Sequence, residues 1–212
     1  MSTLTLSSPA KINLFLRITG QRPDGYHNLQ TLFQLLDFGD TLSFTSNYSG
    51  KITLDSKIDN IPTKDNLIFR AALILQEHVN GKNGCTISLN KKLPIGAGLG
   101  GGSSNAATAL VGLNSLWECG LPINKLAELG RQLGADVPVF VHGESAFGEG
   151  IGDILTPIDL PERWFLVVTP DCHVPTVEIF SNPQLTRNSS PIKIRALSGE
   201  QCRNDCQSVV LK

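Results

Sequence analysis

The order of apolar and polar residues predicts a chain of mixed strands and helices. Apolar residues three or four positions apart indicate an amphipathic helix, whereas alternating residues or short apolar runs indicate a strand. The helical spacing predicts helices over residues 67–79, 104–117 and 123–133. The other patterns predict strands over residues 3–6, 12–18, 41–44, 51–54, 85–89 and 165–169. The continuous run over 165–169 is typical of a buried strand.

Glycine, proline and Asp-Gly pairs mark where several of these segments end. Residues 21–27 contain both Pro and Asp-Gly, which predicts a turn. The segments 41–44 and 51–54 are close enough in sequence to form a hairpin-like pair. A glycine cluster over 145–152 is not followed by a patterned helix, so it predicts a bend between strands.

Short polar side chains and glycines suit the predicted helix ends. Asp65 or Asn66 can cap the first helix, because an Asp or Asn oxygen accepts from a free N–H of the first turn. Gly134 suits the position just after the third helix. Asp136 follows at once and, from its position alone, could cap the next turn.

The stretch 93–107 is the most distinctive part of the sequence. Five glycines fall within Gly96–Gly102, and a predicted helix follows. Glycine lacks a Cβ, so its backbone N–H groups can approach a ligand closely. The free N–H groups and positive dipole end of the helix favour an anion, most often phosphate. Lys91 and Lys92 could assist, but a solvated lysine pair at a strand end is an equally good interpretation.

Three interpretations of this stretch compete. A Walker A loop would need Lys at the position of Ser103, so that pattern fails. The spacing G-x-G-x-x-G is met by Gly96, Gly98 and Gly101. A dinucleotide fold, however, places its glycines in the first turn after a strand, and here residues 91–94 intervene. A loop that binds nothing is disfavoured by the two potential caps and the patterned helix that follow.

Composition narrows the class of protein. The chain has 212 residues and 41% hydrophobic residues, which suits one large or two small globular domains. A net charge of −1 gives no reason to expect nucleic-acid binding. The N-terminus resembles no secretory signal, and no apolar run is long enough to span a bilayer. We therefore expect a cytoplasmic protein with no membrane or nucleic-acid partner.

The cysteines fit the same expectation. There are five, an odd number with scattered spacing: Cys85, Cys119, Cys172, Cys202 and Cys206. Cys202 and Cys206 could form half of a metal site, but no second pair completes it. Reduced thiols of a cytosolic protein are the preferred interpretation.

Several separated motifs together resemble the GHMP kinases, a superfamily of small-molecule kinases. Pro94 is followed by Leu99-Gly100 and then by Gly101–Ala107, which reads Gly-Gly-Ser-Ser-Asn-Ala-Ala. Earlier in the chain stand Pro-Ala-Lys-Ile-Asn-Leu over 9–14 and Asp-Gly-Tyr-His over 24–27. The motifs agree in order and spacing, and the resemblance covers essentially the whole chain.

The resemblance implies an α+β GHMP kinase fold with two domains. An N-terminal ATP-binding domain would occupy 1–158, and the beginning of a C-terminal α/β substrate domain would occupy 159–212. The implied activity is transfer of the ATP γ-phosphate to a hydroxyl of a cytidine-diphosphate-linked polyol, a step in isoprenoid and terpenoid precursor biosynthesis.

By the same resemblance, two residues would be catalytic and a loop would bind ATP. Lys11 would stabilise charge, and Asp136, in Gly-Ala-Asp-Val-Pro, would act as the base. The implied ATP-binding residues are Asn66, Pro94, Ile95, Gly96, Ala97, Gly98, Leu99, Gly100, Gly101, Gly102, Ser103 and Ser104. Mg²⁺ would bridge the phosphates, with Ser103 or Ser104 as its ligand. Without the resemblance, Lys11 would be interpreted as a solvated charge at a strand end.

The implied substrate site holds a cytosine ring. Tyr26 and Phe180 would sandwich the ring and His27 would bind its edge, a sound arrangement for a flat base. Asn13 and Thr176 would complete the site. From sequence alone, a core position for Phe180 is equally good, and Tyr26 and His27 could be ordinary surface and loop residues.

One departure and two rival functions remain open. Family members carry a third glycine-rich motif in the C-terminal domain, and nothing like it occurs before Lys212, so the second domain is expected to be incomplete. The rivals are another small-molecule GHMP kinase, for a sugar or mevalonate, and a catalytically silent nucleotide-binding fragment.

Overall fold

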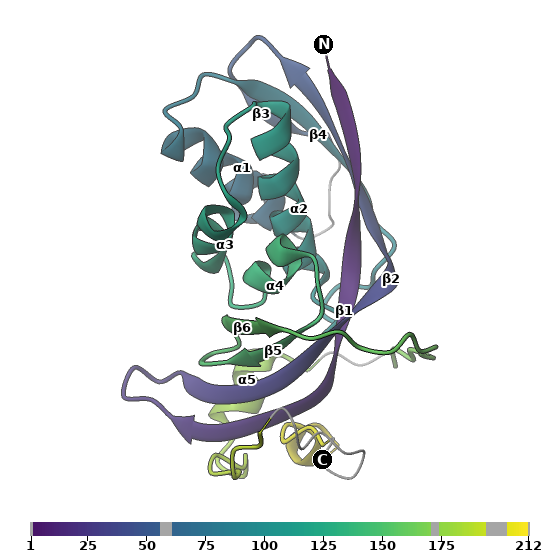
Figure 1. Cartoon of the computed structure of the whole chain (residues 1–212), viewed down its shortest axis with the longest axis vertical. Coiled ribbons are helices and arrows are strands. Elements are labelled where there is room, and N and C mark those ends of the chain that lie inside the picture. The colour runs from purple at the N-terminus through teal and green to yellow at the C-terminus, as the bar shows by residue number, and fades with distance from the viewer. Residues whose placement is uncertain (1, 56–60, 171–173, 194–202, 212) are drawn as a thin grey trace. The chain divides into compact units, whose positions relative to one another are not determined.

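The computed structural model describes residues 2–55, 61–170, 174–193 and 203–211. These residues form two compact units (Figure 1). The first unit comprises Met1–Ala10, Leu36–Ile95 and Gly100–Gly143. The second comprises Lys11–Leu35, Gly96–Leu99 and Glu144–Lys212.

The described residues form both strands and helices, as the sequence pattern predicts. The strands are β1 (Thr3–Gln21), β2 (His27–Asn47), β3 (Ile52–Leu54), β4 (Gly84–Asn90), β5 (Ala146–Glu149) and β6 (Ile154–Pro157). The helices are η1 (Thr63–Asp65), α1 (Leu67–His78), α2 (Gly101–Leu116), α3 (Ile123–Arg131), α4 (Val137–His142), α5 (Thr176–Ser181) and α6 (Gln207–Val210). The predicted strands 3–6 and 12–18 are parts of β1, and the turn 21–27 is confirmed between β1 and β2.

The sheet of the first unit contains the early part of β1, the later part of β2, β4 and β3. β2 pairs with β4 antiparallel, from Thr41 opposite Asn90 to Asn47 opposite Gly84. β3 pairs with β4 in parallel. The predicted pairing of 41–44 with 51–54 is therefore wrong, because β4 lies between these strands.

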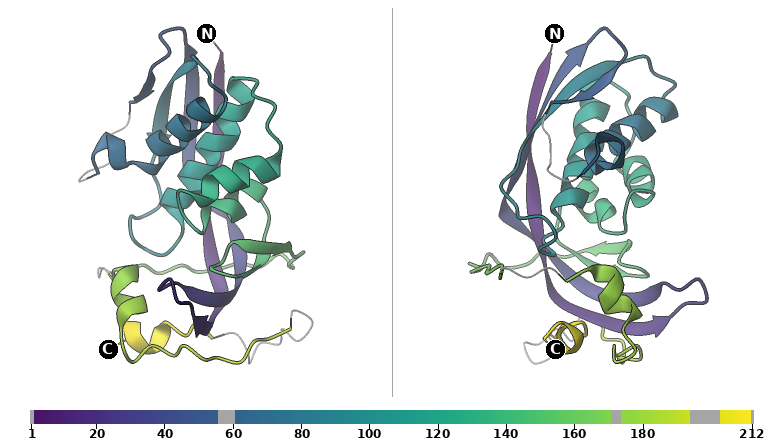
Figure 2. Two further views of the ribbon diagram at one scale, coloured as in Figure 1. Left: turned by 90° about the vertical axis from the view of Figure 1, so that its left-hand side faces the viewer. Right: turned by 180° about the vertical axis from the view of Figure 1, so that it is seen from behind.

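The parallel pairing of β3 and β4 has a simple cause. Parallel neighbours need a crossover connection rather than a tight turn, and α1 provides it between β3 and β4. Helices α1 to α4 lie on one face of this sheet (Figures 1 and 2).

A close approach of α2 to the sheet depends on one glycine. A Cβ built on Gly112 would lie 2.7 Å from Cε2 of Phe44, a fully buried residue of β2. Only a residue without a side chain allows the helix to pack at this distance. The surrounding core includes Leu42, Ile87 and Leu113, all fully buried.

The second unit is built on the later part of β1 and the first part of β2. β5 pairs antiparallel with β2, with Thr31 opposite Gly148, and β6 pairs with β5. The predicted bend over 145–152 is confirmed as the β5–β6 hairpin. Phe15, Leu32 and Phe147 form one core cluster of this unit.

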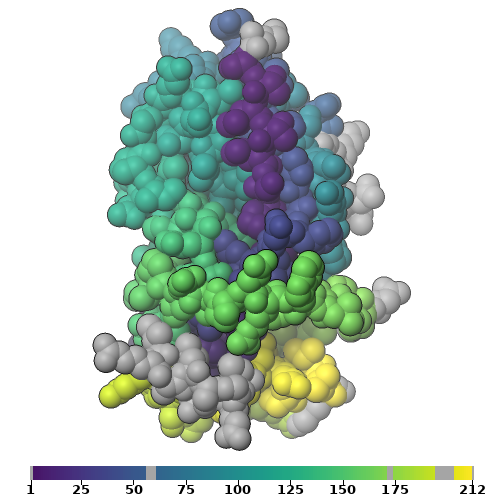
Figure 3. All heavy atoms as spheres, turned by 45° about the vertical axis from the view of Figure 1, so that its right-hand side comes forward, coloured from purple at the N-terminus to yellow at the C-terminus, as the bar shows by residue number. Residues whose placement is uncertain are grey.

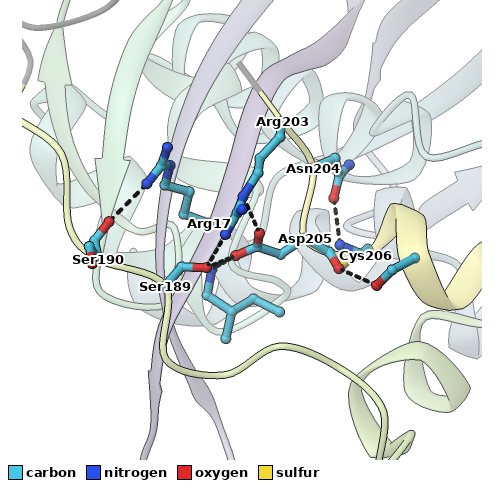
Figure 4. A network of polar contacts seen from close by, with 9 residues as sticks. Arg17, Ser189, Ser190, Arg203, Asn204, Asp205 and Cys206 are labelled. Carbon is cyan, nitrogen blue, oxygen red and sulfur yellow. Dashed lines mark hydrogen bonds and ion pairs between the residues drawn. The ribbon is translucent and has the colours of Figure 1, made fainter. Parts of the chain in front are cut away.

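The segment 203–205 binds β1 through a buried carboxylate (Figure 4). Asp205, with its side chain only 2% exposed, accepts hydrogen bonds from the Ile18 amide at 2.8 Å and the Ser189 hydroxyl at 2.6 Å. It also pairs with Arg203 at 3.0 Å. Beside these contacts, Asp205 donates its amide to the Leu16 carbonyl. This part of β1 is thereby hydrogen-bonded along its edge.

The predicted buried strand over 165–169 is wrong. Residues 158–170 form neither strand nor helix, and Trp164, Leu166 and Val168 are 100%, 92% and 74% exposed. Figure 3 shows this bright green segment on the surface. A strand needs a ladder of backbone hydrogen bonds, and no described residue provides one here. Apolar composition alone therefore did not make a strand.

The helix predictions are confirmed apart from their ends. Helices 67–79 and 123–133 correspond to α1 and α3, and helix 104–117 corresponds to α2, which begins three residues earlier. Gly134 is not in the left-handed conformation expected of a glycine after a helix, since its φ is not positive. Instead its carbonyl accepts the Val137 amide, which continues the turn into α4.

Replacing Gly112 by Ala should destabilise the first unit. The added methyl would overlap the Phe44 ring, so we expect the free energy of unfolding to fall by about 1–3 kcal/mol, more than the gain in helix propensity offsets. Urea unfolding monitored by circular dichroism measures this. Ser115→Ala, at an exposed position of the same helix, is the control and should be near neutral. Equal stability of both variants would contradict the close packing.

Candidate nucleotide-binding and substrate-binding residues

The first turn of α2 presents free backbone donors, as the glycine stretch predicts. Gly100 precedes the helix in the left-handed conformation with φ of 71°. Gly96 and Gly98 also have positive φ. The first amide that bonds back to the loop is that of Ser104, which donates to the Gly100 carbonyl. The preceding N–H groups of the first turn have no partner within the helix and form the positive end of its dipole.

A buried carboxylate holds the start of the glycine stretch. Asp40, whose side chain is fully buried, accepts from the backbone amides of Lys92 and Leu93 at 2.7 and 2.8 Å. It also pairs with Nζ of Lys91 at 2.7 Å. A Cβ built on Gly101 would lie 3.2 Å from the same Nζ, so Lys91 reaches the first residue of α2. Lys91 is thus an internal ion-pair partner rather than a solvated charge.

The charge state of Asp40 follows from these contacts. Burial by itself raises the pKa of a carboxyl group, since it disfavours the charged form. At Asp40 the Leu93 amide, Lys91 and the Lys92 amide more than offset burial, so the pKa of Asp40 lies below its ordinary value. No sequence pattern indicates this role of Asp40, which precedes a predicted strand and finds its partners 51 to 53 residues further along the chain.

A second anchor holds the first turn of α2. The hydroxyl of Ser8, on β1, donates to Oγ of Ser104 at 2.9 Å and to Oδ1 of Asn105 at 2.7 Å. All three residues are buried, with exposures of 0%, 0% and 2%. Ser103 is only partly buried. The two serines of the motif therefore differ: Ser104 is held inside the unit, whereas Ser103 is partly open to solvent.

Asn66 and Asp136 lie at helix starts in the same unit. Asn66 is buried and its side chain accepts from the Ile68 amide at 2.9 Å, so it, and not Asp65, caps α1. Asp136 precedes α4, but its side chain makes no capping hydrogen bond to that helix. The interpretation of Asp136 as a helix cap is therefore wrong.

Lys11 and Asn13 lie in a polar chain inside the second unit. Lys11 is 6% exposed, so it is not a solvated charge at a strand end. Its Nζ donates to Oδ1 of Asn13 at 2.7 Å and lies 5.8 Å from the centre of the Phe33 ring. Asn13 in turn donates to the Thr31 hydroxyl at 2.7 Å, which donates to the Phe15 carbonyl. Each of these polar groups is oriented by the next.

The predicted cytosine-binding residues of the second unit are in part brought together. His27, at the start of β2, is 6% exposed, and its ring lies 5.2 Å from that of Phe180 on α5. Phe180 also packs against the core cluster around Ile18. Tyr26 is 61% exposed, and no ring contact with Phe180 occurs among the described residues. Thr176 begins α5 and is exposed.

Arg187, which sequence reasoning missed, touches both ring-bearing segments. Its Nε donates to Nε2 of His27 at 3.1 Å. Its terminal nitrogens donate to the carbonyls of Phe180, Asn182 and Leu185. Burial and the positive charge of Arg187 both lower the pKa of His27. A single Arg in a polar, proline-containing stretch has no pattern that could have revealed this.

The described residues hold neither a candidate metal cluster nor a helix that could span a membrane. No group of three or more His, Cys, Asp or Glu side chains that could hold a metal ion was found among them. Cys85, Cys119 and Cys206 are free thiols, while Cys172 and Cys202 lie outside the described residues. None of the helices described here is both long and apolar enough to cross a membrane.

Comparison with known proteins assigns the chain to a class and then to a family. The model of the GHMP kinase N-terminal domain matches residues 66–144, the part that contains the glycine stretch and α2 to α4. Solved structures agree: a mevalonate kinase of Methanococcus jannaschii shares this fold with a TM-score of 0.57 at 18% identity. The chain has the α+β fold of a GHMP kinase.

Closer relatives define the family. The 4-diphosphocytidyl-2-C-methyl-D-erythritol kinase of Hahella chejuensis (strain KCTC 2396) is 55% identical over 99% of this chain and 75% of its own length. That of Pseudoalteromonas atlantica (strain T6c / ATCC BAA-1087) is 54% identical over 96% of this chain and 71% of its own length. A crystal structure of 4-(cytidine 5'-diphospho)-2C-methyl-D-erythritol kinase is 32% identical, with a TM-score of 0.81 over 98% of this chain and 77% of that one. The chain belongs to the 4-diphosphocytidyl-2-C-methyl-D-erythritol kinase family.

Replacing Asp40 by Asn should weaken the anchor of the glycine stretch. The variant leaves Lys91 without its carboxylate and loses two charge-assisted hydrogen bonds, so we expect the free energy of unfolding at neutral pH to fall by about 1–3 kcal/mol. Because the pKa of Asp40 is lowered on folding, its ionised form stabilises the fold above the unfolded pKa, and this contribution is lost as pH falls through the folded pKa.

Urea unfolding at neutral and acid pH therefore tests the assignment. The stability difference between the wild type and Asp40→Asn should shrink as the pH is lowered. Glu128→Gln removes a carboxylate from the exposed pair with Lys125 and should leave the stability unchanged. A difference between Asp40→Asn and the wild type that grows toward acid pH would contradict the role of Asp40.

Proposed function

We propose that this protein transfers the γ-phosphate of ATP to the 2-hydroxyl of 4-diphosphocytidyl-2-C-methyl-D-erythritol, in the non-mevalonate route to isoprenoid and terpenoid precursors. The observation that carries the proposal is identity of 54–55% to curated kinases of that name over nearly the whole chain. The glycine stretch with two buried anchors supports it chemically, since phosphoryl transfer depends mainly on positioning and charge stabilisation.

Residues 94–104 of the glycine stretch would hold the ATP phosphates. Its support is the set of free N–H groups at the start of α2, which the contacts of Asp40 and Ser8 hold in place. Asn66 would lie near the nucleotide base. Its buried side chain oxygen caps α1, which leaves its amide nitrogen as a donor toward the base.

Asp136 would act as the general base and Lys11 as the stabilising cation. A carboxylate can accept the proton of the substrate hydroxyl as that oxygen attacks phosphorus. The ammonium of Lys11, oriented by Asn13, would stabilise the negative charge on the transferring group.

Mg²⁺ is the cation that we propose at the phosphates. Mg²⁺ in such sites is held by one or two protein oxygens together with phosphates and water. Ser103 fits this role because it is partly exposed at the start of α2, whereas the Ser104 hydroxyl is bonded to Ser8. The ion would neutralise charge on the phosphates when bound.

The cytidine part of the substrate would bind to the second unit. Tyr26 and Phe180 would stack on the ring, His27 would bind its edge, and Asn13 and Thr176 would complete the contacts. The contact between His27 and Phe180 supports this assignment, and so does the exposed ring of Tyr26, which is available for stacking.

We also propose the domain division and the cellular location that the resemblance implies. Residues 1–158 would form the ATP-binding domain and 159–212 the beginning of the substrate domain. The free thiols Cys85, Cys119 and Cys206 support a reducing compartment, the cytoplasm.

An ADP-release assay with a panel of alcohols tests the function. We expect turnover with 4-diphosphocytidyl-2-C-methyl-D-erythritol, and none with mevalonate, homoserine or galactose. Asp136→Asn should lower kcat by roughly 10²-fold or more, with little change in ATP affinity, because the variant keeps the shape but loses the base. Asp55→Asn, an exposed carboxylate of the same unit, is the control. Turnover with another alcohol alone, or none at all, would favour the rival functions.

The phosphate-binding role of the glycine stretch is tested by Gly101→Val. Its Cβ would lie 3.2 Å from Nζ of Lys91 and 3.4 Å from Leu93, beside the donors of the first turn. We expect ATP to bind roughly tenfold more weakly or worse, measured by calorimetry. Gly20→Val, where the nearest atom lies 3.8 Å away, should bind ATP normally. Unchanged affinity in Gly101→Val would mean that the glycines serve only a turn.

A further inference from the structure

Arg187 contacts the imidazole ring of His27 in a way that bears on which ring nitrogen carries the proton. It lies in the second unit, after α5, and makes four hydrogen bonds, one to the imidazole ring and three to backbone carbonyls. The carbonyl partners are those of Phe180, Asn182 and Leu185, so the guanidinium is tied to the end of α5. A fork of rigid donors held at several points has little freedom to move away from the ring.

The chemistry of this contact determines which nitrogen of His27 carries the proton. A guanidinium only donates hydrogen bonds and stays charged at all relevant pH. Nε2 of His27, which receives the Nε–H of Arg187 at 3.1 Å, must therefore be the unprotonated acceptor. A neutral imidazole has one bare nitrogen and one N–H, so the proton lies on Nδ1.

The same contacts fix the ring in space. Arg187 joins His27 to the Phe180 carbonyl, and the two rings lie 5.2 Å apart with an angle of 39° between their planes. His27 is 6% exposed, which leaves little room for the ring to turn over. Nδ1 makes no hydrogen bond to any residue in the described part of the chain. The geometry thus leaves one N–H of fixed direction that no described residue uses.

We propose that Arg187 is a positioning residue, which holds His27 as the neutral Nδ1–H tautomer and thereby makes this site a donor toward the base of the ligand. Resting on the proposed function, this assigns a source of base specificity. A donor at this point can donate to a pyrimidine whose ring nitrogen is bare, as N3 of cytosine is. The same donor disfavours binding of uracil, because N3 of uracil carries a hydrogen and two donors would face each other.

The tautomer can be read directly, with no substrate and no turnover. In the full 212-residue chain labelled with ¹⁵N at histidine, two-bond ¹H–¹⁵N spectra distinguish protonated from bare ring nitrogens. The signals of His27 are assigned by their loss in His27→Asn. At neutral to slightly basic pH we expect a protonated Nδ1 and a bare Nε2. A protonated Nε2, in either the other tautomer or the imidazolium, would overturn the proposal.

The role of Arg187 itself is tested by Arg187→Met, with Arg163→Met as the matched control. Arg163 is an exposed residue of the same unit, so its loss changes the charge equally. Arg187→Met should lose the single tautomer, whereas Arg163→Met should keep it. In steady-state assays, the ratio of kcat/KM for the cytidine substrate to that for its uridine analogue should fall about tenfold in Arg187→Met only. An unchanged tautomer and an unchanged ratio in folded Arg187→Met would contradict the proposal.

The outcomes separate this inference from the proposed function. A chain with the Nδ1–H tautomer that phosphorylates none of the alcohols would contradict the function and leave the role of Arg187 in place. An active cytidine-specific kinase with a protonated Nε2 would support the proposed function and contradict the role of Arg187. If Arg187→Met fails to fold, the spectrum of the wild type still decides the tautomer.

Discussion

The burial of the Asp40 carboxylate is the constraint on which the start of the glycine stretch depends. A charge removed from water must be matched by donors, or its burial costs several kcal/mol. At Asp40 the donors are Lys91 and the amides of Lys92 and Leu93, so the start of the glycine stretch has one position that satisfies the charge. Ser8 fixes the far side through Ser104. The first turn of α2, whose N–H groups have no partner within the helix, is thereby tied to buried residues of the same unit.

The second unit applies the same principle to side chains that we propose as ligand-binding groups. Lys11 is oriented by Asn13, and Asn13 by Thr31. His27 is oriented by Arg187, which also binds the carbonyl end of α5. In each case a residue that could act on a ligand is held by a neighbour that does not need to touch it. Such support is what keeps a binding group in a productive direction.

The sequence was most informative where structure depends on neighbours along the chain. Helix α1 could be predicted because its apolar spacing and its Asn66 cap are local. The glycine loop before α2 could be predicted for the same reason, since its glycines and the helix that follows are neighbours in sequence. The pairing of β2 with β4 could not, because the register joins residues such as Thr41 and Asn90 that are distant in sequence. The strand order therefore depends on the pairing of β4 with β2, which the apolar pattern of either strand does not indicate.

Distance along the chain also explains the residues that were missed. The donors to Asp40 lie 51 to 53 residues further along the chain, and Arg187 is separated from His27 by 160 residues. Neither residue belongs to a spacing pattern, so only the fold reveals its partner. The motifs that resemble known kinases supplied Lys11, Asp136 and His27, but they contained no sign of what orients Lys11 and His27.

The exposed run Trp164–Val168 has a consequence for how the protein behaves in concentrated solution. Its five consecutive aromatic and aliphatic residues make no backbone hydrogen bond within the described part of the chain, and they have the composition from which intermolecular β-sheets grow. The sequence on each side opposes such growth: Pro161, Glu162 and Arg163 precede the run, and Pro170 and Asp171 follow it. Proline cannot extend a ladder, and like charges of stacked copies repel. We therefore expect these flanking residues to oppose self-association of the protein through the exposed run.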